Sequence, residues 1–327
     1  QGKDSVPNAS RTFVSSDSQI HADALTEGDG GEVIVWADNV TGYYGNITAR
    51  GGIQQGDGGF VEVSGKTSLD FSGAVDVSAT SGKDGTVLLD PRDIIIEPDD
   101  GLPDDNAQVG DSQILLNDGG ATTDFQIDDT ALTALTGNIR LEAQRDIIVN
   151  ASSTLDFTNQ TLGETVVFEA GRDIKSDRSL RTAGASVTLS ASGLIQAIRV
   201  ITQGGDITIT GETLDISGDT TPALFADGTT INNNGGTVIV EATGDIVLQG
   251  AVARPFTGGN FGDITVSSQT GNIEFTGFNN GGGVITFEAP SGDIIVTNGT
   301  LTNADNIVFN VVSLEKADHF FIFTMLY

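Results

Sequence analysis

Cysteine is absent from this chain of 327 residues, and histidine, methionine and tryptophan occur only two, one and one times. The absence of cysteine excludes a disulfide framework, a thiolate metal site and a cysteine nucleophile. The two histidines, His21 and His319, give little support for histidine-based acid–base chemistry. A protein of this composition has to gain its stability from its fold alone.

Basic residues are also scarce, because 15 Lys and Arg stand against 45 Asp and Glu, a formal net charge of −30. Such a surface repels phosphate backbones and anionic membranes, which argues against nucleic acid as a partner. The apolar run HFFIFTMLY at residues 319–327 is shorter than the ~20 residues of a membrane-spanning helix. We therefore expect no membrane insertion and interpret the acidic excess mainly as a solvated surface.

Glycine is abundant, with 43 copies, and glycine-initiated segments of alternating polarity recur along the chain. The strings VIVWA (33–37), IRLEA (139–143) and ITFEA (285–289) place apolar residues first and third and a small residue fifth. Alternation with period two indicates a strand with one buried face. The first inward residues recur at intervals of 20 to 31 residues: Val33, Val61, Val87, Ile114, Ile139, Val166, Val187, Ile207, Val238, Ile264, Ile285 and Ile307.

A second strand follows each of these segments at a nearly constant offset. Ile139 is followed by Ile147, and Val238 by Ile246, eight residues on. A third short segment is visible in several units, such as LDF at 69–71 and again at 155–157. Three short strands per repeat, closed by Gly, Asn or Asp corners, predict an all-β parallel β-helix (solenoid) of about 12 coils. A propeller or a sandwich fits this unit less well.

We expect a single β-helix over residues 1–315 with two departures from the pattern. Residues 97–136 are acidic and contain proline, which predicts an irregular insertion with one coil strand at Ile114 and Leu116. At the end of this insertion Asp128 or Asp129 is expected to cap a short helical turn that carries Leu132 and Leu135. Residues 316–327 lose the corners and the alternation and form an aberrant tail.

The string GDGG occurs at residues 28–31 and 56–59 and raises the question of a ligand loop. A dinucleotide fingerprint requires a helix after the glycines, whereas a strand is expected here. Calcium-binding nonapeptides require immediate tandem repeats, which the chain lacks. We therefore interpret GDGG as a corner at which Asp bonds its own backbone. A calcium-dependent surface module is kept as an alternative.

Enzymes on β-helices cleave acidic polysaccharides with clustered carboxylates, so paired acids deserve a test. Three pairs lie in the acidic stretch or at its edge, where like charges are usually solvated. The pairs are Asp99 and Asp100, Asp104 and Asp105, and Asp128 and Asp129. We expect no catalytic residue, cofactor or metal ligand, and keep a carbohydrate-active lyase or hydrolase as the alternative.

Two further groups of residues carry weaker signals. Trp36 with Tyr43 and Tyr44 predicts either a sugar-stacking platform or a structural cap. Sequons for N-glycosylation occur in a chain so rich in Asn, Ser and Thr that most would arise by chance. Their asparagines are Asn8, Asn39, Asn46, Asn150 and Asn298.

The strings VIVWAD (33–38), ITARGG (47–52), GGFVEVSGK (58–66) and VLLDP (87–91) resemble a known family over residues 7–96. This segment is similar to filamentous haemagglutinin-like and high-molecular-weight adhesin-like exoproteins of Gram-negative bacteria, many of them cyanobacterial. The resemblance implies a right-handed parallel β-helix exported by two-partner secretion through an outer-membrane β-barrel transporter. No catalytic residue carries over, because the matched motifs are structural.

The resemblance also implies a location and a role. Residues 1–10 lack the apolar core of a signal peptide and an initiator Met, so we expect an internal segment downstream of the secretion domain. The segment is then part of a large secreted, extracellular protein at the cell surface. We expect an adhesive or structural stalk that acts in adhesion, aggregation or biofilm formation. Its partners would be the transporter, through the parent protein, and surface or matrix glycans or proteins.

Overall fold

The structure is a computed structural model that describes residues 7–98, 126–151, 154–217, 223–228, 234–277, 283–298 and 306–316. The chain is all-β, with 56% strand and 2% helix, and its parallel strands follow one another around an axis. This arrangement is a parallel β-helix and confirms the expected fold class. Residue contacts divide the chain into two compact units, residues 1–152 and 153–327. A single β-helix over residues 1–315 stays a prediction.

The first unit forms three rows of strands, and each strand pairs in parallel with the equivalent strand of the next coil. One row is β3–β6–β9–β12, a second begins β1–β4–β7, and a third is β2–β5–β8. Each full coil therefore contributes three short strands, as expected. The elements are β1 (Arg11–Val14), β2 (Gln19–His21), β3 (Glu32–Ala37), β4 (Val40–Tyr43), β5 (Asn46–Thr48), β6 (Phe60–Gly65), β7 (Ser68–Phe71), β8 (Ala74–Asp76), β9 (Thr86–Leu89), β10 (Ile94–Glu97), β11 (Ile127–Asp128), α1 (Asp129–Thr133), β12 (Asn138–Ala143) and β13 (Ile147–Val149).

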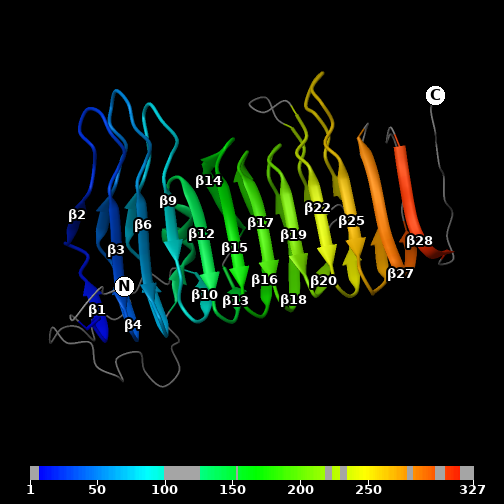
Figure 1. The fold of residues 1–327 in the computed structure, drawn as a ribbon, viewed down its shortest axis with the longest axis horizontal. Coiled ribbons are helices and arrows are strands. Elements are labelled where there is room, and N and C mark those ends of the chain that lie inside the picture. The colour runs from blue at the N-terminus through cyan, green and yellow to red at the C-terminus, as the bar shows by residue number, and fades with distance from the viewer. Residues whose placement is uncertain are drawn as a thin grey trace. The chain divides into compact units, whose positions relative to one another are not determined.

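The second unit repeats this construction. Its longest row is β15–β17–β19–β22–β25–β27–β28, most of which stands side by side in Figure 1. A second row joins β16, β18, β20, β23 and β26, and a third joins β14, β16, β18, β21 and β24. The elements are β14 (Leu155–Thr161), β15 (Thr165–Ala170), β16 (Ile174–Ala183), β17 (Ser186–Ala191), β18 (Leu194–Ile201), β19 (Ile207–Gly211), β20 (Thr213–Ile216), β21 (Leu224–Phe225), β22 (Val238–Ala242), β23 (Ile246–Leu248), β24 (Ala251–Val252), β25 (Ile264–Ser268), β26 (Ile273–Thr276), β27 (Val284–Asn298) and β28 (Asn306–Lys316).

The register confirms the predicted series of inward residues at every coil but one. Val33 pairs with Val61 and Val61 with Val87, and in the second unit the pairing runs from Val166 without a gap to Ile307. The exception is Ile114. Val87 pairs directly with Ile139, so this row has no place for a coil strand at Ile114 and Leu116. Ile114 and Leu116 themselves lie outside the described residues, so a strand there stays a prediction; only its expected place between Val87 and Ile139 is excluded.

Residues 127–133, near the end of the predicted insertion, form β11 and α1. Ile127 of β11 pairs with Phe71 on one side and Ile96 on the other. The predicted helical turn is present as α1, and Leu132 and Leu135 are buried. The predicted side-chain cap is not made, because Asp128 occupies the N-cap position without a side-chain capping bond. Asp128 is already the last residue of β11, so the strand determines where its side chain points.

Stacked side chains fill the inside of the coils. Phe275 of β26 lies over Phe287 of β27, with ring centroids 4.5 Å apart, and Phe287 lies over Phe309 of β28 at 5.3 Å. Phe275 and Phe287 are fully buried. Offset stacking of aromatic rings adds to the stabilisation that burial of their surface provides. Side chains of adjacent coils therefore reinforce the backbone pairing.

We predict that Phe287→Ala lowers the free energy of unfolding by about 3–5 kcal/mol, because it leaves a cavity between two stacked rings. The measurement is urea unfolding followed by circular dichroism. Val308→Ala, on the exposed face of β28, serves as the control and should cost much less. Equal effects of the two substitutions would contradict the stacked core.

Candidate functional site

The GDGG segments lie at the bases of loops that protrude beyond the strand ends. Three such loops, blue to cyan in Figure 1, stack in the first unit over residues 22–31, 49–59 and 77–85. A backbone hydrogen bond closes each base, from Gly31 N to Ala22 O, from Gly59 N to Ala49 O and from Gly85 N to Val77 O, at 2.7 to 2.8 Å. A strand follows each GDGG, as predicted. GDGG therefore lies where a loop closes. Its glycines stand at positions where the backbone comes close to the backbone of neighbouring coils.

The close approach at the loop base explains the glycines. A Cβ atom added at Gly58 would lie 1.8 Å from the Val77 carbonyl oxygen. Gly56 has φ of +139°, a region that favours glycine, and its added Cβ would lie 1.8 Å from the Gly28 carbonyl oxygen. Backbone groups occupy this space, so no room is left there for a phosphate group.

We predict that Gly58→Ala lowers the free energy of unfolding by about 1–3 kcal/mol, because the new methyl group overlaps backbone that cannot move independently. Gly244→Ala is the control, since its added Cβ would come no closer than 3.1 Å to another atom. Chemical denaturation of both variants decides the matter. If Gly58→Ala is as stable as the control variant, the loop base is not as tightly closed as described.

The aspartates of the two GDGG segments bond the next coil and not their own backbone. Asp29 Oδ1 accepts a hydrogen bond from Asp57 N, and Asp57 Oδ1 accepts one from Lys83 N, both at 2.8 Å. The prediction of a corner position is confirmed, whereas the prediction of a bond to their own backbone is wrong. The parallel stack places the backbone N–H of the next coil directly above each carboxylate, and that neighbour does not exist in an isolated turn.

The same bond recurs through both units. In each case Oδ1 of an Asp or Asn accepts the backbone N–H of a residue 21 to 31 positions later, at 2.7 to 3.0 Å. We call this set the carboxylate ladder. Its acceptors are Asp23, Asp29, Asp57, Asp173, Asp206, Asp227, Asn234, Asp245, Asp263 and Asn272. The eight aspartates of this set therefore join adjacent coils, although the acidic excess was interpreted mainly as a solvated surface.

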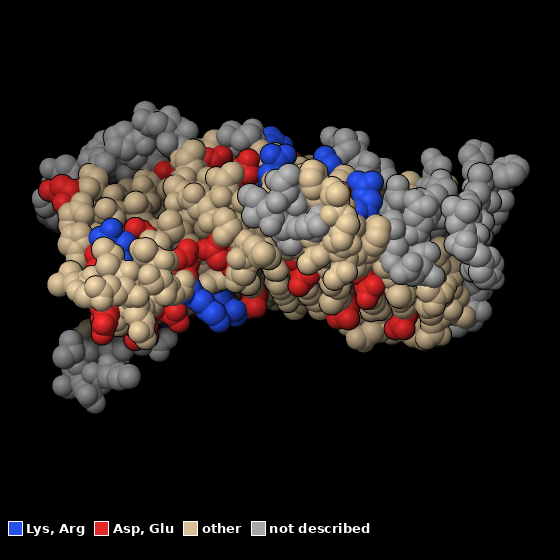
Figure 2. Space-filling view, turned by 90° about the horizontal axis from the view of Figure 1, so that it is seen from above, with Lys and Arg blue, Asp and Glu red and all other residues tan. Residues whose placement is uncertain are grey.

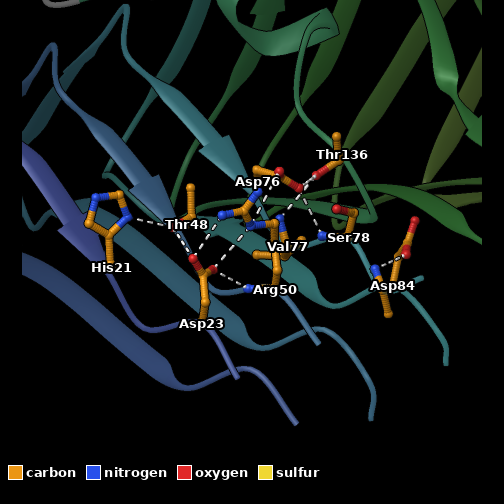
Figure 3. A network of polar contacts seen from close by, with 10 residues as sticks. His21, Asp23, Thr48, Arg50, Asp76, Val77, Ser78, Asp84 and Thr136 are labelled. Atoms are coloured by element: carbon orange, nitrogen blue, oxygen red, sulfur yellow. Dashed lines mark hydrogen bonds and ion pairs between the residues drawn. The ribbon is translucent and has the colours of Figure 1, made fainter. Parts of the chain in front are cut away.

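Two steps of the ladder are strengthened by arginine. Arg50 donates to Asp23 from its backbone N at 2.8 Å and from Nη2 at 2.9 Å, as Figure 3 shows. Arg254 makes the same bonds to Asp227 in the second unit, at 2.8 and 2.6 Å. Both arginines follow their aspartate by 27 residues. The sequence carries a signal for this pair that the predictions above do not use, because Ala-Asp is followed 27 residues later by Ala-Arg at both places.

The hydrogen bond from Arg50 is the main reason that the pKa of Asp23 falls to about 2. A carboxylate with a lowered pKa stabilises the folded state fully above its unfolded pKa of about 3.9, and this stabilisation is lost as the pH falls toward 2. Since Arg50 stays protonated over this range, protonation of Asp23 alone breaks the ion pair.

We predict that Asp23→Asn destabilises the protein at pH 6, and that its difference from the unsubstituted chain shrinks between pH 4 and pH 2. Urea unfolding at several pH values measures this difference. Glu32→Gln removes the same charge from an exposed residue on β3 and is the control. A destabilisation by Asp23→Asn that is the same at pH 6 and pH 2.5 would show that Asp23 acts by packing alone.

His21, Thr48 and Asp23 lie together in Figure 3 and have the residue types of a catalytic triad. The donors and acceptors of their hydrogen bonds are not arranged as in a catalytic triad. Thr48 Oγ1 donates its only proton to Asp23 Oδ2 at 2.9 Å and therefore accepts from His21 Nδ1 at 2.8 Å. In a triad the hydroxyl donates to the imidazole, and the imidazole donates to the carboxylate. The group connects β2 and β5 in this geometry and does not activate Thr48.

The aromatic residues do not form an exposed platform. Tyr43 is fully buried and stacks on Phe71, with ring centroids 5.4 Å apart, and burial raises the pKa of its hydroxyl. Tyr44 is also buried and donates its hydroxyl proton to the carboxylate of Asp70. Trp36 is half-buried, and its carbonyl oxygen accepts a hydrogen bond from Thr12 Oγ1 of β1. Because both tyrosines are buried, the platform interpretation is wrong, and the cap interpretation stays a prediction.

The paired carboxylates divide into two groups. Asp99, Asp100, Asp104 and Asp105 lie outside the described residues, as does His319. Asp128 and Asp129 are buried at the junction of β11 and α1. Within the described ranges no group of three or more His, Cys, Asp or Glu side chains is arranged to hold a metal ion.

Asp90, in the VLLDP string, is a carboxylate whose pKa is raised. Burial raises the pKa of Asp90 to about 6, and the negative charges of Glu142 and Glu62 add to the shift. Glu62 and Glu142 lie on β6 and β12, in the row that also contains β9. Loss of solvation is the largest single cause, and repulsion between acids on stacked coils adds to it.

Three sequon asparagines use their amide nitrogen within the fold. Asn8 Nδ2 donates to Asp38, Asn39 Nδ2 to Ser10 and Asn150 Nδ2 to Glu97, at 2.7 to 3.0 Å. These nitrogens are the atoms to which a glycan would attach. Modification would therefore remove bonds between neighbouring segments. The side chain of Asn298 lies outside the described part.

Figure 2 shows Asp and Glu spread widely over one face, while Lys and Arg gather in a few small groups. Among the described residues no helix is long and apolar enough to span a membrane. No family model, no curated protein and no solved structure matches the chain. The fold is thus established by its own strand pairing, and the resemblance to haemagglutinin-like exoproteins stays a prediction.

Proposed function

We propose that the chain is a structural and adhesive stalk segment of a large secreted surface exoprotein, without catalysis of its own. The observation that supports this is the carboxylate ladder. The polar residues at the coil corners, which are the natural candidates for ligands, bond the backbone of the next coil. Their chemistry holds the coils together and is not directed at a substrate.

The mechanical argument follows from how the coils are joined. Within each unit adjacent coils are bonded by parallel backbone pairing, and several of them also by stacked apolar side chains and by ladder bonds. Parallel pairing in register resists sliding, because a shift of one residue would expose the inward side chains. Such a stack keeps its form without disulfides and can present exposed loops to partners.

The secretion route is part of the proposal. A chain without cysteine forms no disulfide-closed loops, which suits export in an unfolded form through a narrow pore. The VIVWAD and VLLDP strings resemble haemagglutinin-like exoproteins, and this supports a two-partner transporter in the outer membrane and an extracellular location. A gene for such a transporter next to the gene for this chain would support the route.

The adhesive role is tested with microspheres coated with the purified chain. We expect them to bind cells or immobilised matrix polymers more strongly than microspheres coated with albumin. The same preparation should release no new reducing or unsaturated ends from pectin or alginate, and a chelator should leave its melting temperature unchanged. Turnover would support the carbohydrate-active alternative, and a chelator-sensitive melting temperature the calcium-dependent one. The absence of any adhesion would contradict the proposal.

A further inference from the structure

The few basic residues of this acidic chain are unevenly distributed. Five of the 15 Lys and Arg lie between residues 172 and 199, where only Asp173 and Asp177 are acidic. The remainder of the chain therefore holds 10 basic (15 − 5) and 43 acidic (45 − 2) residues. This segment includes β16 and β18, neighbouring strands of the second unit. The net charge of this segment is therefore positive, whereas the net charge of the whole chain is negative.

Three of these residues lie on two neighbouring strands, β16 and β18. Leu180 and Val200 are buried and pair with each other, so that Arg181 and Arg199 beside them point outward. Arg178 belongs to the bulge that precedes this pairing, and its side chain is 41% exposed. We call Arg178, Arg181 and Arg199 the arginine face.

Arg199 lies over an aromatic ring and has an unused donor. Its guanidinium carbon is 4.8 Å from the ring centroid of Phe225, on the next coil. Its Nε is buried and has no acceptor within the part of the chain that the structure describes. Because this Nε is closed to solvent, a ligand at the surface would bind the terminal nitrogens of Arg199 and not this donor. Stacking on Phe225 holds the guanidinium in a fixed orientation.

The other two arginines retain donors for a ligand. Arg181 Nη1 is 3.6 Å from Asp156 Oδ2, beyond ordinary hydrogen-bond distance, and its side chain is 43% exposed. Arg178 Nη1 is 3.3 Å from Asp177 Oδ2. A guanidinium has five N–H donors in a fork that matches a carboxylate. Each of these weak, exposed ion pairs leaves several donors available.

We propose that the arginine face binds a linear polysaccharide that carries a carboxylate on its sugar rings, a polyuronate. Successive coils are about 4.8 Å apart. In the register Arg199 lies opposite Ser179 and Arg181 opposite Ile201, so the two arginines stand on neighbouring coils, offset by two residues along the strands. A polymer that runs along the stack meets both of them, with its rings against Ile201 and Phe225. This names a ligand class for the proposed adhesive role and rests on that role.

The charge of the whole chain favours a thin polymer over a bulky partner. At physiological ionic strength charges act over about 8 Å, so a polymer that touches only the arginine face is largely shielded from the acidic remainder. A second copy of the chain brings another net charge of −30. Nucleic acid carries phosphates at a higher density and a larger diameter, which places more of them near acidic residues.

The test compares matched variants for binding to immobilised polygalacturonate and to dextran, a neutral polymer, by biolayer interferometry. Arg181→Gln with Arg199→Gln removes two charges from the face. Lys66→Gln with Lys83→Gln removes two charges from exposed residues of the first unit and is the control. We expect the first variant to bind polygalacturonate at least about fivefold more weakly, and the control to bind like the unsubstituted chain. Binding should also weaken with added salt.

Folding of the variants is checked by circular dichroism. If the double variant unfolds, Arg178→Gln alone, at an exposed side chain, should still weaken binding measurably. Several results would overturn the inference: no preference for polygalacturonate over dextran, equal weakening in the control, equal competition by double-stranded DNA, or a dimer that the arginine substitutions dissociate. Adhesion of coated microspheres that persists in the Arg181 and Arg199 variant contradicts only this inference, whereas no adhesion of the unsubstituted chain contradicts the proposed function.

Discussion

The rest of the structure depends on parallel pairing of each strand with its equivalent one coil further along the chain. This register places equivalent residues of successive coils side by side, within hydrogen-bond distance. A type of side chain that packs or bonds well at one position therefore does so again at the same position of the next coil. Aliphatic and aromatic residues form continuous stacks inside, as Phe275, Phe287 and Phe309 do. The same register places Asp and Asn of one coil beneath the backbone N–H groups of the next, which creates the carboxylate ladder.

The ladder also accounts for how so acidic a chain folds. Forty-five acidic side chains would repel one another if they all lay free on a closely spaced stack. A carboxylate that accepts a backbone N–H is stabilised in its charged form, and the arginine at Asp23 strengthens this effect. Asp90 shows the opposite case. Its pKa rises because it is partly buried and because the charges of Glu142 and Glu62 act on it. Whether the charge of an acidic side chain stabilises or destabilises the stack depends on which groups of the next coil it faces.

The loops and the arginine face show how such a repetitive framework can vary. The glycine-closed loop bases let a coil lengthen without disturbing the strands, because the loop leaves and re-enters at one bonded point. The arginine face varies the framework without lengthening a coil. Strand positions on neighbouring coils carry arginine there, a residue type that is scarce in this chain. The binding surface that we propose needs no pocket, only the same register that aligns the core.

The sequence by itself determined the fold class, the period and most of the register. Each coil contains its own alternation of inward and outward residues, and a pattern repeated at Val33, Val61 and Val87 has few other ways to bury its apolar face. It also indicated that GDGG precedes a strand and that a short helical turn carries Leu132. These are local properties, and local spacing is what a sequence displays.

Only the tertiary structure decided what depends on neighbours from other coils. It placed Val87 against Ile139 and so removed the expected strand at Ile114 from this row, since a pairing partner some 50 residues away leaves no local trace. It showed that Asp29 and Asp57 accept hydrogen bonds from the next coil and not from their own turn, and that Tyr43 and Tyr44 are buried. It also brought Arg181 and Arg199, 18 residues apart in sequence, onto adjacent outward positions. Each of these contacts exists because coils stack, and stacking is a property of the folded chain as a whole.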